Sequence, residues 1–244
     1  MDTKAEIAGR LIARMEQSAA LRNRARASEG AMRARELLRR WQSERLARTH
    51  ADLLADKRFH DAAQFFLDEI YGLKDTAQRD ADVARVAPTL TRVLPEAGLE
   101  TVADAVELDA LSEELDADMV KALGRRIETI DSAAYAAAYR KMGRRADRER
   151  QLGLVDHLGH ALDRLTRRAF AGTALKMMRK PAEMAGFADL QIFLQTGYNA
   201  FRKMGSADEF LARVIGRENA INEALFAGND FLLDAGPADF GALR

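Results

Sequence analysis

Apolar residues recur at intervals of three and four along almost the whole chain, which is the spacing of one face of an α-helix. The clearest run is Phe59, Ala62, Ala63, Phe66, Leu67 and Ile70. The breaks between such runs are short and often contain glycine, and only 4 of the 244 residues are proline. Runs rich in β-branched residues, which are typical of strands, are absent. The sequence therefore predicts an all-α protein, an irregular bundle of about nine or ten helices with an N-terminal helical arm.

The chain divides by composition into three predicted parts. Residues 1–55 form a basic helical arm or hairpin, and residues 56–228 form the helical bundle. Residues 229–244, which include Gly236 and Pro237, form a loose tail.

Local sequence signals predict some of the helix boundaries within the bundle. Asp131 is typical of a helix N-cap, and Ser206 with Glu209 three residues later is typical of a capping box. Pro181 predicts the start of a new helix, because proline lacks the N–H that a helix interior requires.

Charge is unevenly distributed although the formal net charge is zero. Residues 1–50 hold twelve Lys or Arg against six acids, whereas residues 66–119 hold fourteen acids against four bases. The favoured interpretation is that the basic arm packs on the acidic segment of its own chain or of a partner copy. The alternative is that the arm binds nucleic acid or anionic lipid. Trp41 is the only aromatic residue of the arm, which makes a base-stacking surface unfavourable.

Several classes of protein are excluded by missing residue types and motifs. The chain has no cysteine, so it has no disulfides, thiolate metal sites or cysteine nucleophiles. It also lacks phosphate-binding glycine loops, a serine nucleophile elbow and a His-Glu-x-x-His zinc motif. The N-terminus is charged, and no stretch approaches the roughly 18 apolar residues of a membrane helix. We therefore expect a cytoplasmic protein without membrane insertion.

Glu69 marks the first candidate site, because it lies at the edge of the apolar face that contains Phe66. A carboxylate there needs a cationic partner, for which Arg79 and Arg140 are candidates. The favoured interpretation is a structural helix–cap–helix corner. The alternative is a ligand-binding pocket. Its candidate residues are Glu69, Tyr71, Asp75, Arg79, Tyr139 and Arg140.

Glu107, Glu114, His157 and His160 are candidate metal ligands. The two glutamates lie seven residues apart on one helical face, about 10 Å from each other, so a shared metal needs ligands from a facing helix. The two histidines lie three residues apart on one face and suit a metal or a haem, although surface or interface histidines are favoured. The chain has no Glu-x-x-His motif, which argues against a di-iron bundle. The cofactor remains undetermined by the sequence.

Met177 and Met178 precede an aromatic group formed by Phe193, Tyr198 and Phe201. These side chains have the spacing of an ordinary helical core, which is the favoured interpretation. The alternative is an apolar pocket for a hydrophobic ligand.

The segment from residue 65 to residue 80 has a distinctive order of aromatic, acidic and basic residues. It contains Phe65-Phe66-Leu67, Asp68-Glu69, Tyr71-Gly72, Lys74-Asp75 and Arg79-Asp80. It resembles the pattern FFLxDLYGxKDxxxRD of a family of uncharacterised bacterial proteins. The resemblance continues through Val93-Leu94-Pro95, the run from Leu111 to Asp116 and the pair Arg217-Glu218. It implies a shared fold but no established activity.

Three functional hypotheses follow from these observations. The favoured one is a non-enzymatic protein that binds or regulates a partner, either a second copy in a homodimer or another protein. The second is a metal- or haem-dependent enzyme or a small-ligand binder with its site inside the bundle. The third is nucleic-acid binding through the basic arm, which is possible but not favoured. The sequence leaves open whether the protein is an enzyme.

Overall fold

The computed structural model describes residues 3–69, 82, 85, 87 and 96–243. Within this part of the chain there are ten α-helices, three short 3₁₀ helices and no strand, which confirms the prediction of an all-α bundle. The α-helices are α1 (Lys4–Arg26), α2 (Glu29–Thr49), α3 (Ala51–Ala55), α4 (His60–Glu69), α6 (Glu96–Leu123), α7 (Ser132–Met142), α8 (Arg145–Thr166), α9 (Ala171–Met184), α10 (Ala188–Met204) and α11 (Asp208–Phe226). The 3₁₀ helices are η1 (Gly124–Thr129), η2 (Phe231–Leu233) and η3 (Pro237–Leu243).

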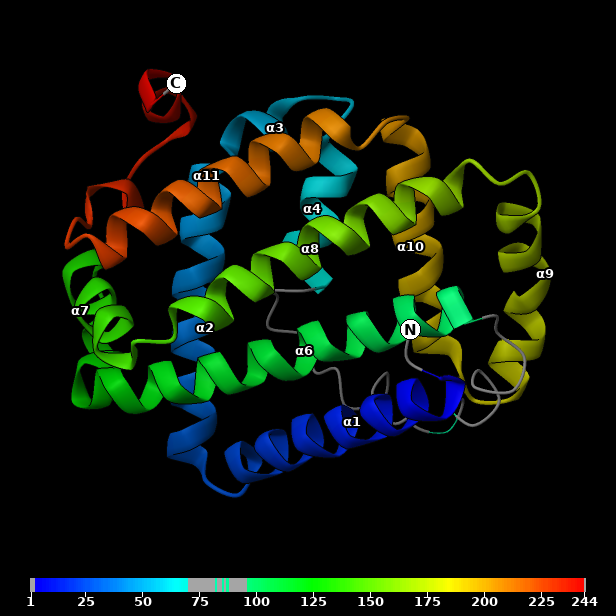
Figure 1. Cartoon of the computed structure of the whole chain (residues 1–244), viewed down its shortest axis with the longest axis horizontal. Coiled ribbons are helices and arrows are strands. Elements are labelled where there is room, and N and C mark those ends of the chain that lie inside the picture. The colour runs from blue at the N-terminus through cyan, green and yellow to red at the C-terminus, as the bar shows by residue number, and fades with distance from the viewer. Residues whose placement is uncertain (1–2, 70–81, 83–84, 86, 88–95, 244) are drawn as a thin grey trace.

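The long helices form two crossed groups. Helices α1, α6, α8 and α11 run side by side across the view of Figure 1, each in contact with the next. Helices α2, α4 and α10 cross behind them (Figure 1). Helix α9 packs mainly on α10 and lies at the outer edge of the molecule (Figure 1).

Caps fix several helix ends as expected from the sequence. The Thr3 hydroxyl accepts the Glu6 N–H, and the Glu6 carboxylate accepts the Thr3 N–H at 2.6 Å, so α1 begins in a capping box. The Asp131 carboxylate accepts the N–H of Ala134, which confirms its prediction as the N-cap of α7. Gly143 ends that helix in the left-handed conformation, with φ of 64°.

The prediction of a capping box at Ser206 was wrong. Helix α11 begins at Asp208 after the cap residue Ala207, which makes no side-chain cap hydrogen bond. Glu209 does not reach back to Ser206, because it forms ion pairs with Arg58 and Arg213. The Ser206 hydroxyl instead accepts the N–H of Asp208 at 3.4 Å.

Pro181 does not start a helix, because α9 continues through it from Ala171 to Met184. Pro181 and Met177 are both exposed, so the Met177 carbonyl that loses its N–H partner four residues later lies on the solvent side of the helix. Exposed Met177 and Met178 also contradict the prediction that they belong to the core or to an apolar pocket.

The buried side chains of the described residues form three core clusters. The first surrounds Tyr135 and Tyr139 between α2, α6, α7 and α11. The second is aromatic and joins α4, α10 and α11. The third is small and lies between α1 and α6. Leu232 and Leu233 belong to the first cluster, so this part of the segment expected to be a loose tail is packed against the bundle.

The basic arm packs along the acidic helix α6 of the same chain. Arg14 Nε lies 2.6 Å from a Glu107 carboxylate oxygen, and Arg22 Nη2 lies 2.5 Å from Asp109. Arg22 also pairs with Glu113, which is buried. The structure therefore confirms the favoured interpretation of the uneven charge. The basic arm and the acidic helix, whose opposite charges also suggested a dimer, pair within one chain.

Glu113 is the most heavily paired carboxylate in this interface. It accepts from Arg22 Nε at 3.1 Å, from Arg39 Nη2 at 2.6 Å and from Arg35. Burial alone would raise the pKa of its carboxyl group, but the three guanidinium groups outweigh burial and lower that pKa from its usual value. The arm is thus held by ionised groups.

Candidate functional site

The first candidate site falls mostly outside the described residues. Tyr71, Asp75 and Arg79 are not described, nor is the side chain of Glu69. A ligand site around them stays a prediction.

Tyr139 and Arg140, which were also candidates, lie on different sides of α7. Tyr139 is buried, and its hydroxyl donates to Asn222 Oδ1 at 2.6 Å. Arg140 is exposed and donates to the carbonyl of Leu225 at 3.4 Å. Of the two, only Tyr139 points into the interior of the bundle.

Arginines hold both glutamates of the candidate metal site. Glu107 is buried and accepts from Arg14 Nε at 2.6 Å and from Arg150 Nε at 3.1 Å. Glu114 accepts from Arg144 Nη2 at 3.2 Å and also pairs with Arg14. The described geometry thus gives each carboxylate a structural ion pair.

The two histidines of the candidate metal site face different carboxylates at the surface. His157 Nε2 lies 3.6 Å from Asp104, and His160 Nε2 lies 3.6 Å from Asp208. Both side chains are more than one third exposed. Within the described part of the chain, no group of three or more His, Asp or Glu residues is arranged to hold a metal ion.

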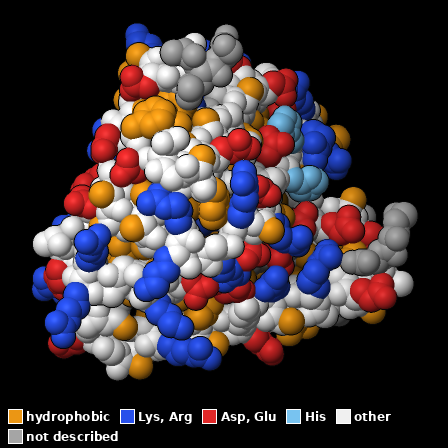
Figure 2. All heavy atoms as spheres, turned by 60° about the vertical axis from the view of Figure 1, so that its left-hand side comes forward, with side chains coloured by type: hydrophobic (Ala, Val, Ile, Leu, Met, Phe, Trp, Pro, Cys, Tyr) orange, Lys and Arg blue, Asp and Glu red, His pale blue; other side chains and the backbone are white. Residues whose placement is uncertain are grey.

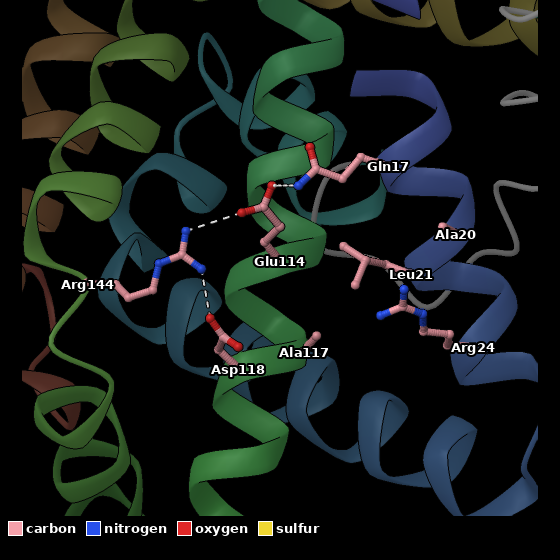
Figure 3. Close-up of a pocket in the computed structure, with 8 residues that line it drawn as sticks. All are labelled: Gln17, Ala20, Leu21, Arg24, Glu114, Ala117, Asp118 and Arg144. Atoms are coloured by element: carbon pink, nitrogen blue, oxygen red, sulfur yellow. Dashed lines mark hydrogen bonds and ion pairs between the residues drawn. The ribbon is translucent and has the colours of Figure 1, made fainter. Parts of the chain in front are cut away.

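A broad groove of about 430 Å³ lies between α1, α6 and the start of α8. Figure 3 shows Glu114 between Gln17, which approaches from α1, and Arg144. Arg144 also holds Asp118 at 2.7 Å and Asp147 at 2.6 Å. The hydrogen bond to Asp147, together with those to Asp118 and Glu114, raises the pKa of Arg144 above its usual value. Glu114, Asp118 and Arg144 thus pair with one another across the groove, which leaves these three groups engaged.

A smaller cavity of about 50 Å³ lies inside the bundle between α2, α7, α8 and α11. Hydrocarbon from Ile221, Leu225 and Leu233 forms part of its wall. Its polar lining comes from Gln42, Arg45, Tyr139, Arg148, Glu218 and Asn222.

Glu218 supplies the negative charge of this cavity. Arg45 Nη1 lies 2.5 and 2.7 Å from the two carboxylate oxygens, and His50 Nε2 lies 3.0 Å from one of them. Burial raises the pKa of Glu218, but the charge of Arg45 and the hydrogen bond from His50 outweigh burial and lower the pKa to about 2. Glu218 is therefore ionised at neutral pH and already neutralised by Arg45.

Arg148 supplies a second positive charge with no such partner. Its side chain is buried at 8% exposure, and its guanidinium carbon lies 4.9 Å from the centre of the Tyr139 ring. Nη1 donates to Gln151 Oε1 at 3.1 Å. Nε and Nη2 are buried and have no hydrogen-bond acceptor among the described residues. Arg148 also forms no ion pair with any described residue. One edge of a buried cation is thus left for a ligand.

The titratable acids of the cavity are unsuited to proton transfer near neutral pH. Burial raises the pKa of the Tyr139 hydroxyl above its usual value, so Tyr139 stays protonated. Glu218 stays ionised. A general acid or base works best when its pKa lies near the operating pH. The arrangement favours binding of an anion over acid–base chemistry.

The sequence identified Tyr139 as a candidate but not Arg148, the buried cation of the cavity. Arg148 lies in a run of charged residues, 144–150, which is typical of a solvated helix surface. Its burial depends on the neighbouring α2 and α11, which the run itself does not specify. Glu218 was noted only through the resemblance of the pair Arg217-Glu218 to the bacterial family.

Comparison with known proteins gives a family but no activity. No curated protein and no solved structure matches the chain. A family model matches residues 21–231, a range that includes every polar cavity residue named above, and its description names no activity, in agreement with what the resemblance implied. The chain therefore belongs to the family described as Domain of unknown function (DUF8198).

Proposed function

We propose that this protein is a non-enzymatic binding protein whose ligand is a small carboxylate or a similar oxyanion held by Arg148. The observation that carries the proposal is the buried guanidinium with unpaired Nε and Nη2. An uncompensated buried charge is strongly destabilising, and a bound anion removes that penalty. Nε–H and Nη2–H lie on the same edge of the planar guanidinium, which matches the two oxygens of a carboxylate.

The cavity volume limits the ligand to a small one. A buried water needs about 10–15 Å³ of such volume, so a cavity of about 50 Å³ accepts roughly three to five non-hydrogen atoms. Formate, acetate, bicarbonate and nitrate have this size and carry the required negative charge. Haem, nucleotides and lipids are too large for this cavity.

Binding at this site would have a regulatory character. The cavity lies between α2, α7, α8 and α11, so an anion on Arg148 of α8 would stabilise the packing of four helices at once. This supports the regulatory part of the favoured sequence hypothesis. Nucleic-acid binding through the arm receives less support, because Arg14, Arg22 and Arg39 are engaged with the acidic helix α6.

The test is anion-dependent thermal stability, measured at constant ionic strength with sodium formate, acetate, bicarbonate or nitrate replacing chloride. At a ligand concentration ten times the Kd, the linkage relation gives about 1.4 kcal/mol of stabilisation, which raises the Tm of a chain of this size by about 3–5 °C. Arg148→Met removes the charge while keeping much of the hydrocarbon volume, and we expect it to abolish the response. Isothermal titration calorimetry with the most effective anion then gives the Kd.

Arg164→Met is the matched control, because Arg164 lies on the same helix and is exposed. It should respond to the anion as the wild type does. The proposal is wrong if no oxyanion stabilises the wild type more than chloride does, or if the Arg148 variant responds equally.

A further inference from the structure

Most of the exposed apolar side chains gather in one region of the molecule. Of the ten large hydrophobic residues that the structure describes as exposed, seven lie within residues 165–194. We call the most prominent of them, together with Lys176 and Lys180, the α9 surface. Its apolar members are Phe170, Met177, Met178, Met184 and Ile192, with exposures of 84%, 73%, 55%, 90% and 62%.

Helix α9 turns its apolar stripe away from the bundle. Met177 and Met184 lie seven residues apart and hence on one side of the helix. Gly172 and Ala182, which are buried, each lie five residues from Met177, about 140° around the helix axis. The helix is therefore attached through Gly172, Ala182 and the half-buried Leu175, and it presents its methionines outward at the edge of the molecule (Figure 1).

The same region is strongly basic. Residues 164–184 contain six Lys or Arg and one acid, which is Glu183. Lys176 and Lys180 are exposed and flank the apolar stripe. By contrast, acidic and basic side chains are interspersed over the face of the molecule drawn in Figure 2.

We propose that the α9 surface docks on an anionic lipid bilayer. An amphipathic helix with a protruding apolar side and a lysine- and arginine-rich border lies in the plane of a membrane interface, with its apolar side chains between the headgroups. Basic residues next to that side are attracted to the negative surface of anionic lipid. No described helix is long and apolar enough to cross a bilayer, so the contact is peripheral.

Two other occupants fit the α9 surface less well. A second copy in a two-fold dimer would bring the same basic residues face to face, because the two halves of such an interface are identical. An apolar peptide helix is usually held in a groove. Neither the groove between α1 and α6 nor the cavity includes a residue of α9. The proposal does not depend on the ligand of the cavity.

The experiment is co-sedimentation of the full chain with two kinds of vesicle, phosphatidylcholine alone and phosphatidylcholine with about one third phosphatidylserine. We expect binding to the anionic vesicles, weakened by high salt. Met177→Ser combined with Met184→Ser should lower the partition coefficient by at least about tenfold. Lys176→Gln combined with Lys180→Gln should lower it by about twenty-fivefold, at roughly fivefold per charge.

The control variant combines Ile12→Ser with Met32→Ser, which removes two exposed apolar side chains from α1 and α2, at 50% and 41% exposure. It should bind as the wild type does. All these positions are exposed, and circular dichroism verifies that each variant is folded. Failure to bind anionic vesicles, or binding that neither α9 variant weakens, overturns the proposal. A different result would be dimerisation that depends on concentration and is abolished in the methionine variant, without vesicle binding. That result identifies a second copy as the occupant and also overturns the proposal.

Discussion

Glu218 and Arg45 form a buried ion pair between α11 and α2, and this pair makes a direct contribution to stability that depends on pH. The usual pKa of a glutamate is 4.5, and in the folded protein that of Glu218 is lowered to about 2. A group with a lowered pKa stabilises the fold above its unfolded pKa, and this stabilisation is lost as the pH falls through the folded pKa. A shift of this size corresponds to about 3 kcal/mol, lost between about pH 4.5 and pH 2.

We expect Glu218→Gln to lower the free energy of unfolding by about 3–5 kcal/mol at pH 7, because Arg45 is left buried without its counter-charge. The difference in free energy of unfolding between the variant and the wild type should shrink as the pH falls from 4.5 towards 2, since the wild type then loses the same ion pair. Urea unfolding at a series of pH values measures both effects. Glu223→Gln, at a 74% exposed position of the same helix, is the control and should change stability by less than about 0.5 kcal/mol. An equal difference in the free energy of unfolding at every pH would contradict the lowered pKa of Glu218.

At the scale of elements, close helix contacts depend on glycine. A Cβ built on Gly159 of α8 would lie 2.5 Å from Leu211 Cδ2 and 2.9 Å from Leu211 Cδ1, and Leu211 is fully buried on α11. Gly197 of α10 similarly faces the ring of Phe65 on α4, at 2.9 Å. These glycines determine how closely the helices around the second core cluster can approach one another.

Gly159→Ala should therefore be destabilising, by about 1–3 kcal/mol, because overpacking at a buried contact outweighs the better helix propensity of alanine. Gly153→Ala on the same helix is the matched comparison, since nothing lies within 4 Å of a Cβ built there. That variant should be neutral or stabilising by up to about 1 kcal/mol. Thermal unfolding of both variants provides the measurement. A Gly159 variant as stable as the Gly153 variant would mean that the Leu211 side chain moves aside without a loss of stability.

The elements were largely predictable from local patterns, whereas the side they bury was not. Asp131, as a typical N-cap residue, correctly predicted the start of α7. In α9 the predicted helix start at Pro181 was wrong, and the apolar spacing could not reveal that Met177 and Met184 face solvent, because periodicity is identical for a buried and an exposed stripe. The burial of Arg148 likewise depends on α2 and α11, which are distant in sequence. The cavity thus required the three-dimensional structure.

At the scale of the whole molecule, the three core clusters of the described residues differ in size, and α1 belongs to the smallest. That cluster has five buried members, Ile7, Leu11, Ala87, Leu99 and Ala103. Partly buried Met15, Val102 and Val106 pack against this cluster. Ion pairs make much of the remaining contact between α1 and α6, and several of them are partly exposed, such as that of Arg14, at 31%. Regions with few buried apolar contacts open at lower free energy than the global unfolding transition.

Native-state hydrogen exchange should therefore protect the amides of α1 less than those of α11, which contributes to both larger clusters. Raising the NaCl concentration should speed exchange in α1, because salt screens partly exposed ion pairs, and should leave α11 almost unchanged. Peptide-resolved mass spectrometry at low and high salt measures both, with α11 as the internal reference. Equal protection of the two helices would show that α1 opens only when the whole molecule unfolds.

The ion pairs that link distant parts of the chain also have a consequence for the order of events during synthesis. The arm is made first, yet Glu113, which pairs with Arg22, follows 91 residues later. Glu218 follows Arg45 by 173 residues. A nascent chain therefore emerges with a basic segment that lacks its ion-pair partners on α6 until that helix is translated, and it cannot enclose the cavity until α11 has left the ribosome. Formation of the cavity is thus among the last steps in the biogenesis of this protein.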